Sequence, residues 1–197
     1  TNYELRITDI IEVIQKCKPY LLYVGSFYPH KNIERLIDAF HILLTKYNLD
    51  IKLVLAGKKD YFQKQVEKHL MAYSLQLTAD CFFYGYASDD ELACLYQNAF
   101  LYVFPSFYEG FGLPPLEAMQ FGVPVISSNA SCLPEVLGDA AVYFDPYDVN
   151  DIAQITARLY TNIPLQQELR EKGYAHIQKY SWQKMAEQTL QIYKDVV

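Results

Sequence analysis

Short, continuous runs of apolar residues recur along the chain, and most lead into a loop that contains glycine, proline or small polar residues. A run that is apolar throughout, rather than at alternate positions, is typical of a strand buried on both faces of a parallel sheet. The sequence therefore predicts six strands, which we place at Tyr20–Gly25, Ile51–Gly57, Cys81–Tyr86, Leu101–Phe104, Val123–Ile126 and Ala140–Phe144.

The segments between these strands carry apolar residues at helical spacing. After Asn32, apolar side chains recur every three or four positions from Ile33 to Tyr47, and Asn32 is expected to cap this helix. Ser88, which is followed by acidic residues, and Ser181 are expected to cap two other helices. The remaining predicted helices cover about 1–18, 61–73, a segment ending near 122, 149–160 and 163–178.

Strands that alternate with helices predict an α/β fold. We expect a Rossmann-like doubly wound parallel sheet of about six strands with C-terminal helices, in a single domain over residues 1–197 that begins with a lead-in segment, 1–19. Such a sheet binds its ligand at the carboxyl ends of its strands. The residues at predicted carboxyl ends that we expect to converge on one edge are Gly25, Lys31, Gly85, Glu109 and Gly110.

The stretch Pro105–Met119 joins the fourth predicted strand to a helix through a loop with two glycines. Glycine lets the backbone approach a ligand closely, and free N–H groups at a helix start favour an anion such as phosphate. Glu109 and Glu117 flank this anion site with seven residues between them, and carboxylates accept hydrogen bonds from hydroxyls. The set suits a nucleotide sugar, which has hydroxyls on both sides of a diphosphate. Complementing the helix dipole is the alternative explanation for Glu117.

This stretch resembles the E-x7-E motif of retaining GT-B glycosyltransferases of the large family-four group. Gly122–Ser128 and Leu133–Val136 also resemble that family's pattern, and the similarity runs from about Tyr20 to the C-terminus. The resemblance implies one half of a GT-B fold, the C-terminal domain that binds the sugar donor. It also implies an N-terminal acceptor domain outside this chain, toward which the final helix crosses back.

In this family, a glycine after the first strand is followed six residues later by a lysine that contacts the donor's phosphates, and Gly25 and Lys31 match this pattern. An arginine often accompanies that lysine. Ser26 and His30 stand in the two places where such an arginine is usual. Phosphate binding is therefore expected to depend on Lys31 and on backbone donors.

The resemblance also assigns roles to individual residues. Lys31 and Glu109 are the expected catalytic residues: Lys31 and the loop N–H groups stabilise the departing diphosphate, and Glu109 holds sugar hydroxyls. Glu117 is expected to hold the ribose hydroxyls, and neither glutamate acts as a nucleophile. The loop at Gly85 and Tyr86 is expected to pack against the base. The complete expected donor-binding set is Gly25, Ser26, Lys31, Gly85, Tyr86, Glu109, Gly110, Phe111, Gly112, Leu113 and Glu117.

The reaction that the resemblance implies is transfer of a hexose, of the mannose or glucose type, from a nucleoside diphosphate sugar to a glycan or lipid-linked acceptor. The transfer retains the anomeric configuration and serves polysaccharide or glycan synthesis, and this segment alone is expected to be inactive. The alternatives are a non-catalytic nucleotide-sugar-binding module and a GT-B epimerase or phosphorylase. We expect no obligatory metal, because Asp145 and Asp148 lack a third ligand and fit a capped turn.

The amino-acid composition limits which partners and which location are expected for this chain. A formal net charge of −6 argues against nucleic acid, which requires a basic face. The four cysteines lack paired spacing and are interpreted as reduced thiols of a cytosolic protein; they are Cys17, Cys81, Cys94 and Cys132. No apolar run approaches the roughly 20 residues that span a bilayer. We therefore expect a cytoplasmic protein, which in its full-length form associates peripherally with the inner membrane surface.

Overall fold

The computed structural model describes residues 14–73 and 75–196, and its centre is one six-stranded sheet in which every strand pair is parallel. The strands are Tyr20–Val24 (β1), Lys52–Ala56 (β2), Cys81–Gly85 (β3), Leu101–Phe104 (β4), Val125–Ser128 (β5) and Ala141–Phe144 (β6). The predicted α/β fold is confirmed, and no strand boundary moves by more than two residues. Most of the predicted lead-in segment lies outside the described residues, although residues 14–17 are helical.

The strand order, β3-β2-β1-β4-β5-β6, reverses direction between β1 and β4. The chain leaves β1 toward β2 on one side, whereas it leaves β4 toward β5 on the other. The loops after these two adjacent strands therefore part at the carboxyl edge, which leaves a crevice there. β1 and β4 lie inside the sheet and are buried except for the half-buried Val24, while β3 at the sheet edge is largely half-exposed. The crevice is thus held by two strands of the core.

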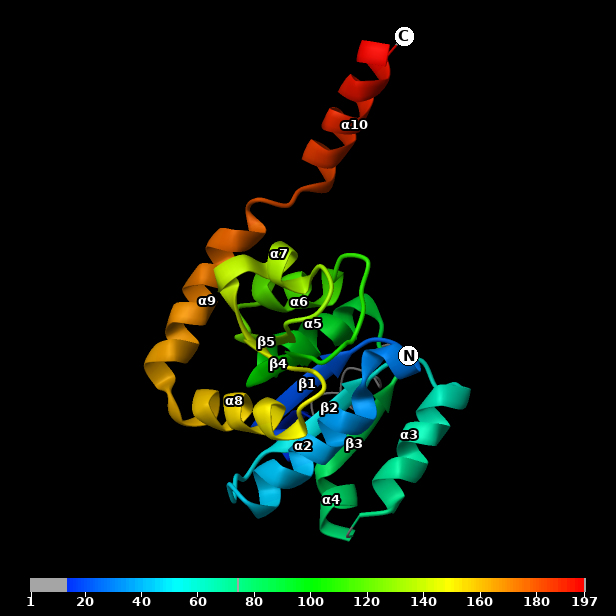
Figure 1. The fold of residues 1–197 in the computed structure, drawn as a ribbon, viewed down its shortest axis with the longest axis vertical. Coiled ribbons are helices and arrows are strands. Elements are labelled where there is room, and N and C mark those ends of the chain that lie inside the picture. Colours follow the sequence, from blue (N-terminus) through cyan, green and yellow to red (C-terminus); the bar gives the residue numbers. More distant parts are fainter. Residues whose placement is uncertain (1–13, 74, 197) are drawn as a thin grey trace, which may run out of the picture.

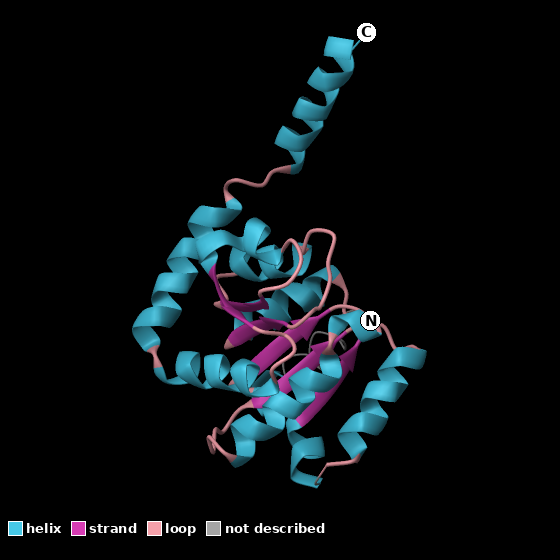
Figure 2. Ribbon diagram, in the orientation of Figure 1, coloured by secondary structure: helices cyan, strands magenta, loops and turns pink. Residues whose placement is uncertain are grey.

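Helices cover both faces of the sheet (Figures 1 and 2). Their bounds are Ile33–Thr45 (α2), Tyr61–Met71 (α3), Leu75–Asp80 (α4), Asp89–Asn98 (α5), Leu113–Gln120 (α6), Leu133–Leu137 (α7), Val149–Thr161 (α8), Ile163–Ile177 (α9) and Trp182–Val196 (α10), with 3-10 turns at Pro29–Lys31 (η1) and Gly138–Ala140 (η2). Because right-handed crossovers run in opposite directions from β1 and β4, α2 and α6 lie on opposite faces. α2 packs against α8, and α6 packs against α9.

The final helix, α10, projects away from the body of the protein (Figure 1). It has no buried residue, although its sequence is strongly amphipathic. The large apolar side chains that it exposes are Trp182, Met185, Leu190, Ile192, Tyr193 and Val196. Helix α10 therefore presents an apolar face that no described residue covers. No helix among the described residues has both the length and the apolar character to cross a membrane.

Local expectations were met at some helix starts and failed at others. Ser88 caps α5 as predicted and forms a capping box with Glu91, and Asp148 caps α8 by accepting from the N–H groups of Asn150 and Asp151. The expectation that Asn32 caps α2 with its side chain is wrong. Asn32 has a φ of 61° and makes no capping hydrogen bond, because its side-chain amide is used elsewhere. The short helices α4 and α7 were not predicted, since neither is long enough to show a periodic pattern.

Candidate functional site

The loop that follows β1 is held close to its neighbours by glycine. Gly25 has a φ of 153°, and a Cβ there would lie 2.7 Å from the hydroxyl of Tyr23. That hydroxyl donates to the carbonyl of Ser26 at 2.6 Å. On the next strand, a Cβ on Gly57 would lie 2.0 Å from the carbonyl oxygen of Gly25. Side chains at either position would push the loop out of place, so both glycines are required by close approach.

Lys31 and Glu109 meet at the carboxyl edge, although 78 positions separate them in the sequence. Lys31 ends the turn η1, Glu109 lies in the loop after β4, and their Nζ and Oε1 atoms are 2.6 Å apart. The two side chains are only 16% and 12% exposed. The backbone N–H of Phe107 also donates to the carbonyl of His30 at 2.8 Å, which ties the two loops together. A cation and an anion are thereby presented side by side at the crevice.

Four consecutive backbone N–H groups next to this pair are uncommitted. Among the described residues, the N–H groups of Gly110, Phe111, Gly112 and Leu113 form no hydrogen bond. Gly112 adopts a φ of 100° and precedes α6 without a side-chain cap. The two residues after Leu113 are prolines and offer no N–H, so the available donors are those of the loop and of Leu113. Such a row of amides next to a helix start suits an anion.

Glu117 lies farther along α6 and is held by a buried tyrosine. The hydroxyl of Tyr96 donates to its Oε2 at 3.1 Å. Burial raises the pKa of Tyr96, and the Glu117 carboxylate raises it further, so this hydroxyl stays protonated and donates. The neighbouring Tyr102, whose ring centroid lies 5.7 Å from that of Tyr96, donates to the carbonyl of Val24 at 3.2 Å.

The tyrosines beneath the edge thus form a row, Tyr23, Tyr102 and Tyr96, which we call the tyrosine row. Burial raises the pKa of Tyr23 well above its ordinary value, and the nearby Glu109 carboxylate raises it further. Burial raises the pKa of Tyr102 in the same way, and Tyr96, Tyr23 and Glu117 add to that increase. The row therefore donates hydrogen bonds from neutral hydroxyls to the carbonyls of Ser26 and Val24 at the first-strand loop and to the Glu117 carboxylate.

The model of the protein family described as Glycosyl transferases group 1 matches residues 7–176. The chain belongs to the glycosyl transferases group 1 family. One relative with a similar sequence is the O-antigen chain mannosyltransferase B of Escherichia coli. It is 36% identical over 194 residues, and the match covers 94% of this chain. The resemblance on which the sequence interpretation rested is therefore confirmed.

Solved structures show that this chain has the fold of one half of a GT-B glycosyltransferase. Sucrose-phosphate synthase from Thermosynechococcus elongatus is 27% identical, with a TM-score of 0.81 over 96% of this chain. A structure of Anabaena Alr3699/HepE in complex with UDP and glucose is 19% identical, with a TM-score of 0.81 over 95% of this chain. The chain spans about half of each relative: 49% of the mannosyltransferase, 48% of the synthase and 52% of HepE.

The residues that are expected to bind the donor do not all lie close to one another. Gly85 and Tyr86 do lie at the carboxyl edge, but on the outermost strand, β3. Gly85 has a φ of 87°, with open space where a Cβ would be, and Tyr86 is 70% exposed. Gly57, whose Cα approaches the first-strand loop, donates its N–H to the carbonyl of Gly85 at 2.9 Å. The base-contacting role of Gly85 and Tyr86 remains a prediction.

Two residues that were not predicted to belong to the site hold the loop of the E-x7-E motif in place. The hydroxyl of Ser131 donates to the carbonyl of Glu109 at 2.9 Å and lies 3.4 Å from the Glu109 amide nitrogen, as its acceptor. The thiol of Cys132 lies 3.3 Å from the same carbonyl and 3.4 Å from that of Phe111. No local pattern could have revealed these contacts, because they join segments more than twenty residues apart. Ser131 and Cys132 fix the backbone from which Glu109 projects.

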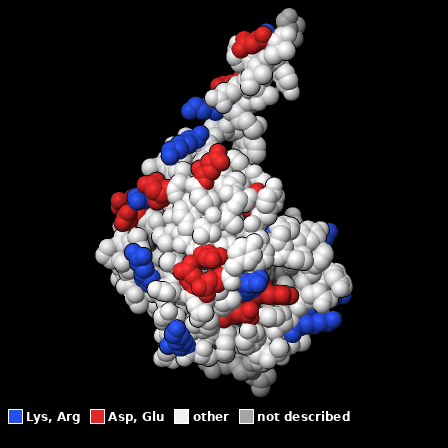
Figure 3. Space-filling model, in the orientation of Figure 1, with Lys and Arg blue, Asp and Glu red and all other residues white. Residues whose placement is uncertain are grey.

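The described residues on the face of the protein shown in Figure 3 form no broad basic patch. On the face shown in Figure 3, acidic and basic side chains are interspersed over the body. Among the described residues, no group of three or more His, Cys, Asp or Glu side chains is placed to hold a metal ion. A phosphate at the sheet edge would therefore rely on the local ammonium group and amides described above.

Proposed function

We propose that this chain is the donor-binding half of a retaining hexosyltransferase that uses a nucleoside diphosphate sugar and takes part in polysaccharide or glycan synthesis. The diphosphate would lie across the amides of Gly110–Leu113, within reach of the Lys31 ammonium group. Glu109 would accept hydrogen bonds from sugar hydroxyls and Glu117 from ribose hydroxyls. Gly25 and Ser26 would line the phosphate side, and Gly85 and Tyr86 the base side.

One observation carries this proposal: the Lys31–Glu109 pair stands, at the point where the strand order reverses, beside four backbone N–H groups that form no hydrogen bond within the described ranges. Backbone donors that point at solvent are normally satisfied by a partner or by water. A cluster of them next to a cation, at the reversal point of a doubly wound sheet, is the arrangement expected for a phosphate-bearing ligand.

The same groups account for the chemistry. As the bond between the sugar and the diphosphate breaks, its electron pair moves to the departing phosphate oxygen. Once the donor is bound, Lys31 and the loop amides would surround this oxygen, so they would stabilise its growing charge. Without a donor, Lys31 is neutralised by Glu109. Donor binding would transfer Lys31 to the diphosphate and free the Glu109 carboxylate for sugar hydroxyls. Both residues would then touch the reacting molecule, and neither needs to form a covalent bond.

The relatives favour particular donors. The 36% identical relative is named as an O-antigen chain mannosyltransferase, and the HepE structure is described as holding UDP and glucose. We therefore expect a mannose or glucose donor attached to GDP or UDP. No obligatory metal is required in this scheme, because Lys31 and the amides supply the positive potential that a divalent cation would otherwise supply.

The acceptor, a glycan or a lipid-linked glycan, would be bound by an N-terminal domain that corresponds to the other half of the relatives. The uncovered apolar face of α10 supports such a partner, because a helix with that pattern gains stability only by packing. Four cysteines without disulfides fit a reducing compartment. The proposed location is accordingly the cytoplasm, with peripheral association at the inner membrane surface.

A thermal-shift and calorimetry screen of GDP, UDP and their mannose and glucose conjugates tests the proposal on this chain. Saturable binding of at least one nucleoside diphosphate is expected, with no requirement for a divalent cation. Absence of binding at millimolar concentration would contradict it. A transfer assay on the full-length protein then separates an enzyme from a module that only binds nucleotide sugar, an alternative that the missing arginine beside Lys31 favours. Detection of the isomerised or phosphorolysed sugar would instead indicate an epimerase or a phosphorylase.

A further inference from the structure

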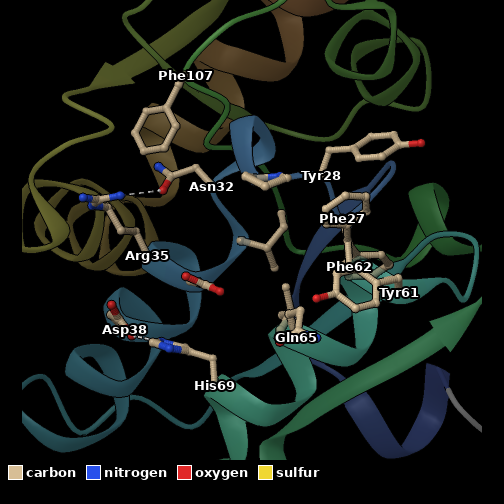
Figure 4. A pocket seen from close by; sticks show the side chains of 14 residues that line it. Phe27, Tyr28, Asn32, Arg35, Asp38, Tyr61, Phe62, Gln65, His69 and Phe107 are labelled. Atoms are coloured by element: carbon tan, nitrogen blue, oxygen red, sulfur yellow. Dashed lines mark hydrogen bonds and ion pairs between the residues drawn. The ribbon is translucent and has the colours of Figure 1, made fainter.

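A cavity of about 670 Å³ lies beside the donor edge, between α2 and α3 (Figure 4). Its volume falls in the range of roughly 300–1,000 Å³ that is usual for small-molecule sites. Its lining consists of Phe27, Tyr28, Pro29, Asn32, Ile33, Glu34, Arg35, Asp38, Tyr61, Phe62, Gln65, Val66, His69 and Phe107. None of the residues proposed to bind the donor belongs to this lining, so the cavity requires its own explanation.

One wall of the cavity is aromatic and remains open to solvent. Tyr28 packs edge-on against Phe62 with ring centroids 4.7 Å apart, and Tyr61 packs edge-on against Phe62 at 5.4 Å. Tyr28 and Tyr61 are nevertheless 45% and 67% exposed. Edge-to-face packing fixes the three rings relative to one another and leaves apolar ring surface available to a ligand. A flat molecule or a ring with an apolar face would find a rigid platform here.

Polar side chains with few partners also line the cavity: Glu34 and Arg35 on α2, across from the aromatic wall, and Gln65 on α3, one turn after Tyr61. In the described part of the chain, Glu34 and Gln65 have no hydrogen-bond or ion-pair partner. Arg35 makes no ion pair there; its guanidinium lies 5.2 Å from the Phe107 ring centroid, and one nitrogen lies 3.4 Å from the Asn32 side-chain oxygen. A carboxylate, an amide and a guanidinium are therefore free to bind a ligand through donors and acceptors of both kinds.

The far end of the cavity is closed by groups that satisfy one another. His69 lies 2.5 Å from Asp38, and the Tyr73 hydroxyl donates to the same Asp38 oxygen at 2.6 Å. With these groups engaged, the remaining charges are Glu34 and Arg35, which offset each other. A phosphate or sulfate would need a surplus of positive charge that the cavity lacks. A neutral ligand rich in hydroxyls needs paired donors and acceptors beside an apolar platform, and the cavity offers both.

We propose that this cavity binds a neutral oligosaccharide, with the apolar face of a pyranose ring on the Tyr28–Tyr61–Phe62 wall and its hydroxyls on Glu34, Arg35 and Gln65. Tyr28 lies three residues before Lys31 in the same loop, and Phe107 lies two residues before Glu109. The cavity therefore adjoins the donor site, where it would hold a part of the glycan acceptor away from the reacting end. This acceptor role rests on the proposed function, whereas saccharide binding itself does not.

The test measures binding of mannobiose and mannotriose to the 197-residue chain by saturation-transfer NMR and calorimetry, without nucleotide. The Tyr61→Ala/Gln65→Ala variant should weaken binding about tenfold, the scale for losing a hydrogen bond together with apolar contact. Tyr193→Ala is the matched control, because Tyr193 on α10 is also 67% exposed and lies outside the cavity. It should leave saccharide affinity unchanged. Both substituted positions are solvent-accessible, and melting curves would verify folding.

Three results would overturn the proposal: no saccharide binding by the unmodified chain, equal weakening by Tyr193→Ala, or loss of saccharide binding through Lys31→Ala rather than through Tyr61→Ala/Gln65→Ala. The affinity for GDP and UDP is measured on the same variants and should not change with Tyr61→Ala/Gln65→Ala. Nucleotide binding without saccharide binding would refute only the cavity, and saccharide binding without nucleotide binding would refute only the donor site.

Discussion

The two ends of the central sheet each carry a lysine paired with a carboxylate, yet they differ in what surrounds the pair. At the amino end, Lys52 at the start of β2 contacts Asp80, and the two side chains are 30% and 14% exposed. The N–H of Lys52 donates to the carbonyl of Pro19 at 3.0 Å, whereas in the described part of the chain the N–H groups of Asp50 and Ile51 just before it form no hydrogen bond. At the carboxyl end, the Lys31–Glu109 pair adjoins four consecutive N–H groups that form no hydrogen bond among the same described residues.

An ion pair by itself therefore does not identify a binding site. Both pairs lock a connection between neighbouring strands or loops, and either would be explained by that role alone. The difference lies in the number and arrangement of the unsatisfied donors next to the pair, because at the carboxyl end four consecutive N–H groups lead into the start of α6, where such groups favour an anion. The experiments below test whether this difference has functional consequences.

The largest expected effect is the difference in nucleotide affinity between a variant without Lys31 and a variant without Lys52. Lys31→Ala should weaken binding of GDP or UDP by about 1–3 kcal/mol, or about 5- to 150-fold, because a charged hydrogen bond to the diphosphate is lost. Lys52→Ala should leave that affinity unchanged. Isothermal calorimetry on both variants measures the difference, with thermal melts as a check on folding. Equal losses in the two variants would remove the distinction between the two ends of the sheet.

Glu117→Ala should reduce affinity for the nucleoside diphosphate more than affinity for inorganic diphosphate. The expected difference is about tenfold, since only the nucleoside compound has ribose hydroxyls for this carboxylate to accept. Competition binding against both ligands measures it. Parallel loss of both affinities would show that Glu117 acts through α6 rather than through ribose.

Glu109→Gln should tighten binding of free GDP or UDP by about fivefold, because Lys31 would no longer be neutralised by an intramolecular carboxylate. The same substitution should fail to tighten the sugar conjugate to that extent, since the amide replaces a stronger acceptor of sugar hydroxyls. Calorimetry with matched pairs, such as GDP and GDP-mannose, gives the comparison. A change of the same sign and size for both ligands argues against contact between Glu109 and the sugar.

Tyr96→Phe is expected to have the smallest effect, a two- to fivefold loss of nucleoside diphosphate affinity, on the scale of one neutral hydrogen bond. Its readout is specific because inorganic diphosphate should bind as before. A second readout is stability at alkaline pH. The pKa of Tyr96 is raised above the ordinary 10.0, so its stabilising effect is complete below pH 10 and is lost above it. Thermal melts of Tyr96→Phe should therefore decline less steeply above pH 10 than those of the unmodified chain.

The sequence was sufficient to predict the sheet and most helices, because continuous apolar runs and helical spacing are local signals. It also brought Lys31 and Glu109 to one edge, since the carboxyl ends of parallel strands must share it. It did not reveal that these two side chains bind one another, because side-chain partners at that separation depend on the loop conformations. Their roles in donor binding remain predictions.

Other contributors left no signal in the sequence. Ser131 and Cys132 read as ordinary loop residues, and Gly57 as the end of a strand, until the fold placed them against the first-strand and motif loops. The rings of the tyrosine row are buried, and the directions of their hydroxyls could only come from three-dimensional packing. The cavity between α2 and α3 went unpredicted for the same reason, because its walls belong to segments of different periodicity.

Asn32 shows what such non-local contacts achieve. Its left-handed backbone directs the side-chain amide to two carbonyls at once, those of Pro105 at 3.0 Å and Pro146 at 2.9 Å, with the side chain almost fully enclosed. Three connections that leave β1, β4 and β6 are thus fastened at a single point. The conformational entropy of these connections is lost during folding rather than on ligand binding, so the crevice is preorganised for its ligand.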